Sequence, residues 1–295
     1  MQKPVTKAVV LAAGFGTRFL PASKAVAKVM FPVIDKPIIQ YVVEELVKAG
    51  ISDIHFILSP FTQDIREHFE PFPALNELLA KSGKEDKIEE LRRIETMARF
   101  SFGLQEKGRH GTGKAILSAR NFVGTEPFVL LFADEFYWAD PPWITQLLEA
   151  YQEYGGSILG CIKTKVPEHG SRYGFATGEE VNERVLRVKD IVEKPGVGQA
   201  PSEWATMSGM VYRPEFLAAL EKADKQLAPE IEMHWTYGLK EMLEADEPVY
   251  GIEYQNYRYF DTGDKLGYLK TMVELGLESK EFGEEFKEYL QSLNL

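Results

Sequence analysis

A short apolar run near the start of the chain leads directly into a glycine turn. Residues 7–13 read Lys-Ala-Val-Val-Leu-Ala-Ala, and Gly14, Gly16, Thr17 and Arg18 follow. An apolar run of this length that ends at glycines predicts a buried β-strand. Glycines let backbone N–H groups approach a polyanion, and an arginine supplies the charge that neutralises it. The pattern predicts a phosphate-binding loop at the carboxyl end of a first strand, where open α/β sheets bind ligands.

The established phosphate motifs do not match this loop. A Walker A loop requires Gly-x-x-x-x-Gly-Lys-Ser/Thr, and a dinucleotide fingerprint requires a third glycine where this chain has Phe19. The chain is therefore neither a P-loop NTPase nor an ordinary dinucleotide-binding protein. A plain glycine turn is the alternative interpretation, but Thr17, Arg18 and, one loop later, Lys28 favour a phosphate site.

Apolar runs and amphipathic stretches alternate through the first half of the chain. This rhythm predicts an α/β fold with a Rossmann-like, mostly parallel mixed sheet flanked by helices. Apolar residues at 39, 42, 43, 46 and 47 form a helical stripe that ends before Gly50. Strands are expected at 7–13, 53–59, 100–105, 128–133 and 157–163, and helices at 37–49, 61–69, 75–97, 114–120 and 141–154.

The second half has shorter strands and longer loops. Strands are expected at 173–176, 185–194, 205–212 and 248–254, helices at 216–221 and 233–243, and a helical tail from 265 to the end. We interpret the chain as one domain, 1–295, with a first half at 1–165, a second half at 166–263 and C-terminal helices at 264–295.

Composition restricts the class of partner. The net charge of −11 argues against a nucleic-acid groove or an anionic membrane surface, so any cationic site must be local. The single cysteine, Cys161, lies in an apolar run and is expected to be a buried thiol. No apolar run approaches about 18 residues, and the N-terminus has no apolar signal region, so we expect a cytoplasmic protein without a membrane span.

Two aspartates follow apolar strands. Asp134 comes directly after the strand at 128–133, and a carboxylate there is costly unless it meets a cation such as Mg²⁺. The adjacent Glu135 is expected to point to the other side. Asp261 ends an aromatic strand at a tight Asp-Thr-Gly turn and is the candidate second metal ligand. The alternatives are a helix cap for Asp134 and a turn-forming role for Asp261.

Three weaker signals lie between these aspartates. Glu193 and Lys194 end a strand before Pro195, which predicts an extended Lys194 with a fixed direction. Gly174 is a position where a flat ring can approach the backbone. Gln105 and the loop 111–113 follow a strand near the glycine turn and are candidates to read the edge of a base.

Together these segments resemble the sugar-1-phosphate nucleotidyltransferases. The resemblance rests on residues 12–24, 35–41, 191–195 and 261–269, and so extends from the first strand to the C-terminal helices. It implies a nucleotide-diphospho-sugar transferase fold, with a nucleotide-binding first half and a sugar-binding second half. It also implies Mg²⁺-dependent transfer of a uridylyl group from UTP to glucose 1-phosphate, giving UDP-glucose and pyrophosphate. Related enzymes often form homo-oligomers, and the same is expected here.

The resemblance assigns roles to individual residues. Arg18, Lys28, Asp134, Lys194 and Asp261 would be catalytic, with Asp134 and Asp261 holding Mg²⁺. Gly174, Glu193 and Lys194 would bind the sugar phosphate. The nucleotide would contact Ala12, Ala13, Gly14, Gly16, Thr17, Gln105, Gly111 and Gly113.

The chain also departs from the family pattern. Ala27 and Val29 flank Lys28 where proline and glutamate are usual, and Ala133 precedes Asp134 where glycine or proline is usual. Lys114 stands where a histidine is common, and residues 228–234 replace a stretch richer in glycine and threonine. These departures leave two alternatives: another pair of nucleotide and sugar phosphate, or a non-catalytic regulator that binds a nucleotide sugar.

Overall fold

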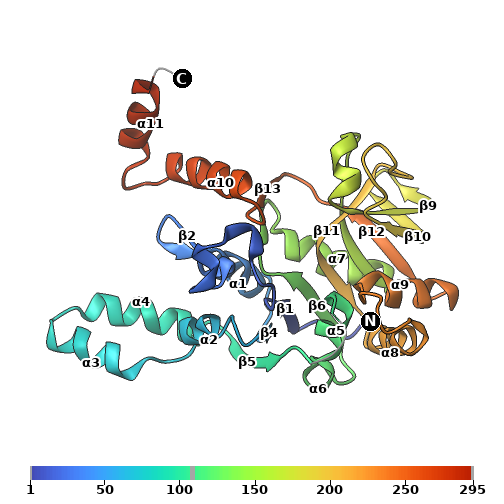
Figure 1. The fold of residues 1–295 in the computed structure, drawn as a ribbon, viewed down its shortest axis with the longest axis horizontal. Coiled ribbons are helices and arrows are strands. Elements are labelled where there is room, and N and C mark those ends of the chain that lie inside the picture. Colours follow the sequence, from blue (N-terminus) through green and yellow to red (C-terminus); the bar gives the residue numbers. More distant parts are fainter. Residues whose placement is uncertain (1, 107–109, 294–295) are drawn as a thin grey trace.

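The computed structural model describes residues 2–106 and 110–293. Among these residues, nine strands form one sheet in the order β5-β4-β1-β6-β11-β8-β12-β10-β9 (Figure 1). Their bounds are β1 Lys7–Leu11, β4 Asp53–Leu58, β5 Arg99–Leu104, β6 Phe128–Phe132, β8 Ser157–Lys163, β9 Gly174–Asn182, β10 Val185–Glu193, β11 Trp204–Tyr212 and β12 Val249–Glu253. Outside this sheet, β2 (Pro32–Val33) pairs with β3 (Lys36–Pro37), and β7 (Glu135–Ala139) pairs with β13 (Tyr257–Asp261).

The sheet is mixed, as the sequence predicts, and the α/β class is confirmed, but among the described residues the parallel pairings are confined to β5-β4-β1-β6 and to β8 with β12. β5, β4, β1 and β6 are parallel neighbours. β11 comes late in the chain but lies antiparallel between β6 and β8. β12 is parallel to β8, whereas β10 and β9 add antiparallel strands. The two predicted halves of the chain therefore share one continuous sheet.

Each face of the sheet packs on its own hydrophobic core. Successive side chains of a strand point to opposite faces, so Val9 belongs to one core and its neighbours Ala8 and Val10 to the other. The helices α1 (Ile38–Lys48) and α7 (Trp143–Tyr154) cover the face of Ala8 and Val10. The helices α5 (Thr112–Leu117), α8 (Glu215–Gln226) and α9 (Trp235–Glu244) cover the other face.

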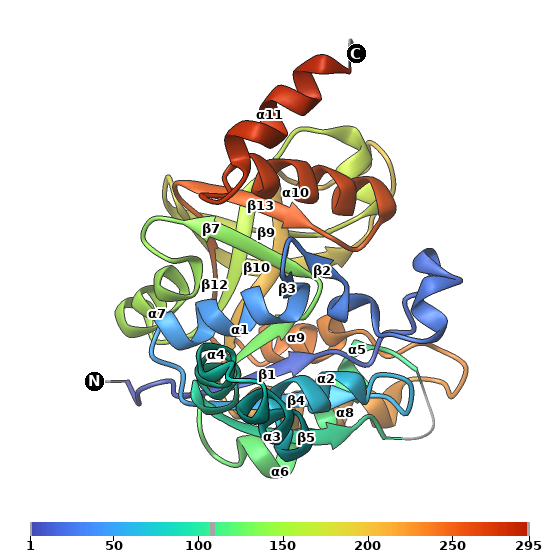
Figure 2. The ribbon, with the colours of Figure 1, turned by 90° about the vertical axis from the view of Figure 1, so that its left-hand side faces the viewer.

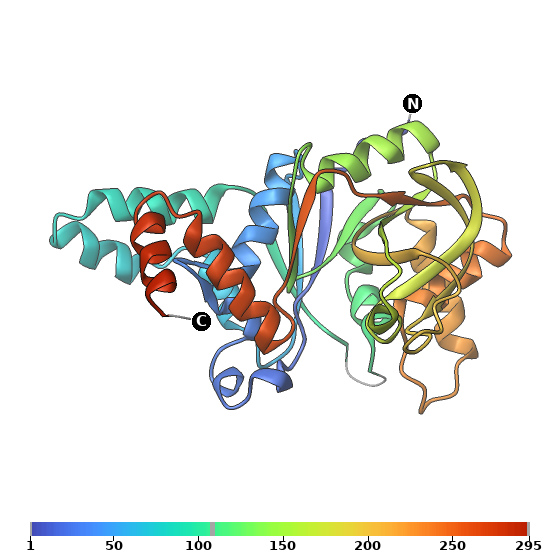
Figure 3. The same ribbon diagram turned by 90° about the horizontal axis from the view of Figure 1, so that it is seen from above.

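The predicted helix at 75–97 is two helices instead. α3 (Pro73–Lys81) and α4 (Glu85–Thr96) meet at a turn around Gly83, whose φ is 68°. Neither helix buries a residue, so only local signals define where each ends. Figures 1 and 3 show this hairpin projecting away from the sheet.

The C-terminal segment is also divided. α10 (Lys265–Leu277) packs on β13, and α11 (Gly283–Ser292) continues from it after a break (Figure 2). The predicted tail therefore contains two helices, and its last two residues lie outside the described part of the chain.

Other boundaries differ in length rather than in type. The predicted helix 61–69 begins only at Asp64 as α2 (Asp64–Phe69), and 114–120 divides into α5 and α6 (Arg120–Val123). The strand predicted at 173–176 is the nine-residue β9. β7 was not predicted. Within the described residues, no helix is both long and apolar enough to span a bilayer.

Gly209 is a position where the packing requires glycine. It lies in β11 at a register shift against β8, and its φ is 99°. A β-carbon there would lie 2.3 Å from Tyr254 Oη and 2.6 Å from the Trp143 ring. Gly124 has a similarly positive φ of 60° but no atom within 4 Å of such a β-carbon.

We expect Gly209→Ala to lower the free energy of unfolding more than Gly124→Ala does. Backbone strain costs each variant about 1–3 kcal/mol, and overpacking costs Gly209→Ala about 1–3 kcal/mol more. Urea titration followed by circular dichroism measures the difference. Equal losses in the two variants would contradict the packing argument.

Candidate active site

The site lies where the parallel strands end. Leu11 of β1 is level with Phe132 of β6, and Leu58 of β4 is level with Leu104 of β5. The residues after these strands, including Ala12, Asp134 and Gln105, therefore emerge at one edge of the sheet. This arrangement agrees with the rule that open α/β sheets bind ligands at the carboxyl ends of their strands.

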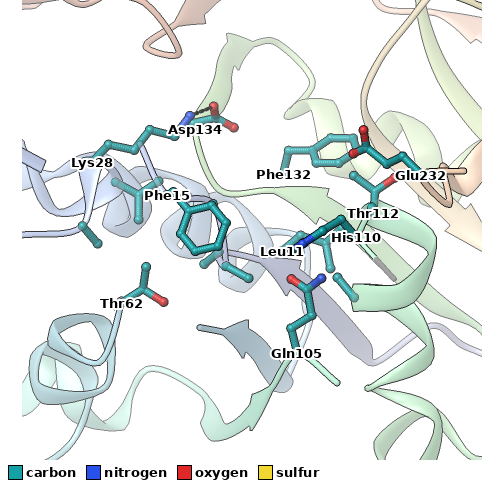
Figure 4. A pocket seen from close by; sticks show the side chains of 17 residues that line it. Leu11, Phe15, Lys28, Thr62, Gln105, His110, Thr112, Phe132, Asp134 and Glu232 are labelled. Atoms are coloured by element: carbon teal, nitrogen blue, oxygen red, sulfur yellow. Dashed lines mark hydrogen bonds and ion pairs between the residues drawn. The ribbon is translucent and has the colours of Figure 1, made fainter. Parts of the chain in front are cut away.

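A first cavity of about 330 Å³ opens at this edge. Figure 4 shows Lys28 and Asp134 at one end and Gln105 with His110 toward the other. Lys28 begins a short 3-10 turn, 28–30, and its ammonium forms an ion pair with Asp134. Of the residues predicted to contact the nucleotide, the cavity is lined by Ala12, Ala13, Gly14, Gln105 and Gly111.

The other predicted nucleotide residues, Gly16, Thr17 and Gly113, do not line the first cavity. Ser23 Oγ donates to Gly16 O at 2.7 Å, which fixes the turn, and Thr17 starts the 3-10 turn 17–19. Gly113 N donates to Met233 O at 2.8 Å, and Met233 N donates to His110 O at 2.9 Å. Gly113 is thus placed against the segment before α9, which holds the loop at 110–113 in position.

Asp134 and Asp261 converge from two distant segments. Asp261 is level with Glu135 in the β7–β13 ribbon, and Thr262 Oγ1 donates to Asp134 O at 2.7 Å. A β-carbon on Gly263 would lie 2.9 Å from Asp261 Oδ1 and 3.3 Å from Asp134 Oδ2. The two carboxylates therefore face the same point.

Arg18 joins this group, because its Nη1 donates to Gly263 O at 3.3 Å. The turn at Asp261 also has the local role that the sequence offered as an alternative, since Asp261 Oδ1 accepts from Gly263 N at 2.8 Å. Asp134 does not cap a helix, because the element that follows it is the strand β7.

A second cavity of about 270 Å³ adjoins the first. Both are lined by Thr112, Phe132, Asp134 and Glu232. The predicted sugar-binding residues Gly174, Glu193 and Lys194 line only the second cavity. Gly174 is level with Glu193 in the β9–β10 pair, and a β-carbon on Gly174 would lie 2.7 Å from Thr206 Oγ1. The absence of a side chain at Gly174 therefore keeps this wall open.

The expected extended conformation of Lys194 is wrong. Its φ is +45°, in the left-handed region, although it precedes Pro195. Lys194 N donates to Tyr173 O at 3.2 Å, and Gly196 N donates to Gly170 O at 2.9 Å. These hydrogen bonds join the segments 167–173 and 194–198 and hold Lys194 in a conformation that costs about 1–3 kcal/mol. Such strain tends to occur at functional sites.

Glu135 was predicted to face away from Asp134, but both residues line the second cavity. The prediction was wrong because a turn at 133–134 separates β6 from β7, so strand alternation does not apply across it. Glu135 Oε2 accepts from Ser208 N at 3.3 Å. Burial, with the charges of Asp134 and Asp261, raises the pKa of Glu135 from 4.5 to about 8.

Burial also raises the pKa of Asp261, and the charge of Asp134 adds to this effect. Burial raises the pKa of Glu193 as well. Groups whose pKa values are shifted by burial and by a neighbouring charge cluster at functional sites. Among the described residues, no three or more His, Cys, Asp or Glu side chains form a metal-binding group. Asp134 and Asp261 nevertheless fit Mg²⁺, which is usually held by one or two carboxylates together with substrate phosphates.

Sequence reasoning missed Arg172, Thr262 and Glu232 as residues of the site. Arg172 and Thr262 adjoin motifs that were recognised, Tyr173-Gly174 and Asp261, so sequence proximity was the available signal. For Glu232 the available signal was the departure of residues 228–234 from the family pattern, and the fold brings this segment to the wall shared by the two cavities.

Comparisons with known proteins agree with this geometry. The family model described as nucleotidyl transferase matches residues 7–276, and the chain belongs to this family. It is 37% identical over 291 residues to UTP–glucose-1-phosphate uridylyltransferase 1 of Staphylococcus saprophyticus, covering 98% of this chain and 99% of that protein. It is 38% identical over 292 residues to UTP–glucose-1-phosphate uridylyltransferase of Staphylococcus haemolyticus, covering 99% of both.

Solved structures with the same fold include UTP-bound UGPase from Acinetobacter baumannii. That structure has a TM-score of 0.87 and 29% identity, covering 98% of this chain and 99% of that one. A UDP-glucose pyrophosphorylase complexed with UDP-glucose has a TM-score of 0.81 and 28% identity, covering 93% of this chain and 100% of that one. The expected nucleotide-diphospho-sugar transferase fold is confirmed.

Thr262 allows a test of how the site is held together. Its buried hydroxyl and backbone N–H both donate to Asp134 O. We expect Thr262→Val, which removes the hydroxyl donor, to lower the free energy of unfolding by about 1–2 kcal/mol. Thr262→Val keeps the shape of the side chain, so its loss reports on the hydroxyl alone. Chemical denaturation of the variant and the parent chain measures the effect, and equal stability of these two would show that the hydroxyl contributes nothing.

Proposed function

We propose that the chain transfers the uridylyl group of UTP to glucose 1-phosphate, giving UDP-glucose and pyrophosphate. Two relatives that share 37–38% of its sequence over nearly the whole chain carry the name of that activity. The observation that best supports the proposal is the pair of adjoining cavities with Asp134 in their common wall. A reaction between two bound substrates requires such a junction.

UTP is assigned to the first cavity. Its phosphates would lie over the turn at Gly14, where Lys28 and Arg18 supply positive charge. Gln105 would read the uracil edge, because its amide offers both a donor and an acceptor. Glucose 1-phosphate is assigned to the second cavity, where Glu193 would accept hydrogen bonds from sugar hydroxyls and Lys194 would bind the phosphate.

Asp134 and Asp261 are the proposed ligands of Mg²⁺. When bound, Mg²⁺ would polarise the α-phosphate and neutralise charge on the phosphates. The turn at Gly263, held to Asp134 through Thr262 and to Arg18, would keep the two carboxylates at a fixed separation.

The chemistry is an in-line displacement at phosphorus. A phosphate oxygen of glucose 1-phosphate forms a bond to the α-phosphorus, and the bond to the oxygen bridging the α- and β-phosphorus breaks. The electron pair leaves with pyrophosphate, whose charge Lys28 and Arg18 would stabilise. The nucleophile is already anionic, so no general base is required. Catalysis therefore depends on positioning and electrostatics.

We also propose that the chain acts as a homo-oligomer through α10. Its exposed apolar side chains are Leu266, Leu269, Val273 and Leu277, at helical spacings of three and four residues. A contiguous apolar stripe on one helix favours burial against another protein surface. The proposed use of UTP agrees with the cytoplasmic location expected from the sequence.

A pyrophosphate-release assay tests the function directly. We expect release with UTP, Mg²⁺ and glucose 1-phosphate, and much slower release with dTTP, CTP or GTP or with mannose 1-phosphate. Fast release with another pair would change the assigned substrates. Tight UTP binding without release from any pair would indicate a regulator instead of an enzyme.

Asp134→Asn should lower kcat by at least about 100-fold, because it replaces a carboxylate proposed to hold Mg²⁺ with a neutral amide, and so weakens the positive charge on the reacting phosphates. Asp246→Asn is the matched control, since Asp246 is an exposed turn residue with positive φ, which asparagine tolerates. The control should retain full activity. Unchanged Mg²⁺ dependence in Asp134→Asn would contradict the proposed metal site.

The oligomer has its own test. Leu269→Glu places a charge in the α10 stripe, whereas Leu78→Glu changes a similarly exposed leucine in the α3–α4 hairpin. Analytical ultracentrifugation should show dissociation of the first variant only. A parent chain that sediments as a monomer would contradict the proposal.

A further inference from the structure

Arg172 lies between the second cavity and the turn that carries Asp261, and the proposed mechanism gives it no role. It follows the 3-10 turn Pro167–Ser171 and directly precedes Tyr173 and Gly174. It lines the second cavity together with Lys194, and it also lines a third cavity that contains Asp261 and Asp264. Its side chain thus reaches from the proposed sugar site to the turn that carries a proposed metal ligand.

The guanidinium of Arg172 is held by two carboxylates. Its Nη2 lies 2.6 Å from Asp264 Oδ2 and 3.8 Å from Asp261 Oδ2. The other oxygen of Asp264 accepts from Leu266 N and Gly267 N, so Asp264 is already fixed as the N-cap of α10. Asp261 therefore forms a longer ion pair with Arg172, without a hydrogen bond, whereas Lys28 donates a hydrogen bond directly to Asp134.

The side chains that line the second cavity carry more acidic than basic groups, so a bound sugar phosphate needs a further positive charge. Among its described lining residues, four are acidic, whereas Arg172 and Lys194 are the basic side chains apart from His234. The acidic residues are Asp134, Glu135, Glu193 and Glu232. A sugar phosphate brings about two more negative charges, and Lys194 alone offers one point charge. A guanidinium has a planar fork of donors that matches phosphate oxygens.

We propose that Arg172 is a second phosphate-binding residue for the sugar phosphate and that it leaves Asp261 and Asp264 to take this role. The inference rests on the proposed function. The exchange has a small energetic cost, because the Arg172 side chain is 47% exposed and solvent-exposed ion pairs contribute little to stability. The same movement frees Asp261 to hold a cation.

Steady-state kinetics of two Arg172 variants test the inference. Arg172→Ala should raise the KM for glucose 1-phosphate by about tenfold or more, from the loss of a charged hydrogen-bonded pair, and change the KM for UTP by less than about twofold. Arg172→Lys should recover part of the loss. Lys270→Ala is the control, because Lys270 lines the third cavity but not the second. It should resemble the parent.

Equilibrium binding gives a readout without turnover. By isothermal titration calorimetry, Arg172→Ala should bind UDP-glucose about tenfold more weakly and UTP unchanged. A purely structural role would weaken both ligands equally or neither, and either result would overturn the inference.

Asp264→Asn provides the opposite perturbation. Asparagine keeps the N-cap of α10 but removes the charge that competes for Arg172. This variant should lower the KM for glucose 1-phosphate by about two- to fivefold, the effect expected of one weak ion pair. A raised KM in this variant contradicts the inference.

If the parent chain makes UDP-glucose but Arg172→Ala is unchanged, only the role of Arg172 fails. If the parent makes none, the proposed function fails with it.

Discussion

The crowding of like charges at one edge of the sheet governs this structure. Asp134, Glu135 and Asp261 come from two strands of one small ribbon and from the turn before it. Burial, and after it their mutual repulsion, raises the pKa values of Glu135 and Asp261. Lys28 and Arg172 each pair with one of these carboxylates. Neither of these two carboxylates is therefore left without a cationic neighbour.

The sheet supplies the geometry for this arrangement. The glycine turn, Asp134 and Gln105 all follow parallel strands that end at one edge of the sheet. β11, from the second half of the chain, pairs with β6 in the same sheet. Asp261 arrives separately, through the β7–β13 ribbon. The hydrogen bonds from Thr262 to Asp134 O connect the two contributions across more than a hundred residues of sequence.

Local patterns were sufficient to predict the parts of the site that follow buried strands. The apolar run before Gly14 and the one before Asp134 both identify a strand end, and the fold brings those ends together. Residues positioned by tertiary contacts could not be predicted in this way. The left-handed Lys194 depends on hydrogen bonds to the 170–173 segment, and Glu135 faces the cavity because a turn interrupts the strand alternation. The break between α3 and α4 was missed because neither helix has a buried stripe that marks its length.

The wall shared by the two cavities limits how such a protein can change its selectivity. Thr112, Phe132, Asp134 and Glu232 face both chambers, so an altered side chain at any of them perturbs both ligands at once. Gln105 borders only the first chamber and Glu193 only the second. With UTP and glucose 1-phosphate placed as proposed, the preference for the base and the preference for the sugar can therefore change independently only through positions that border one cavity.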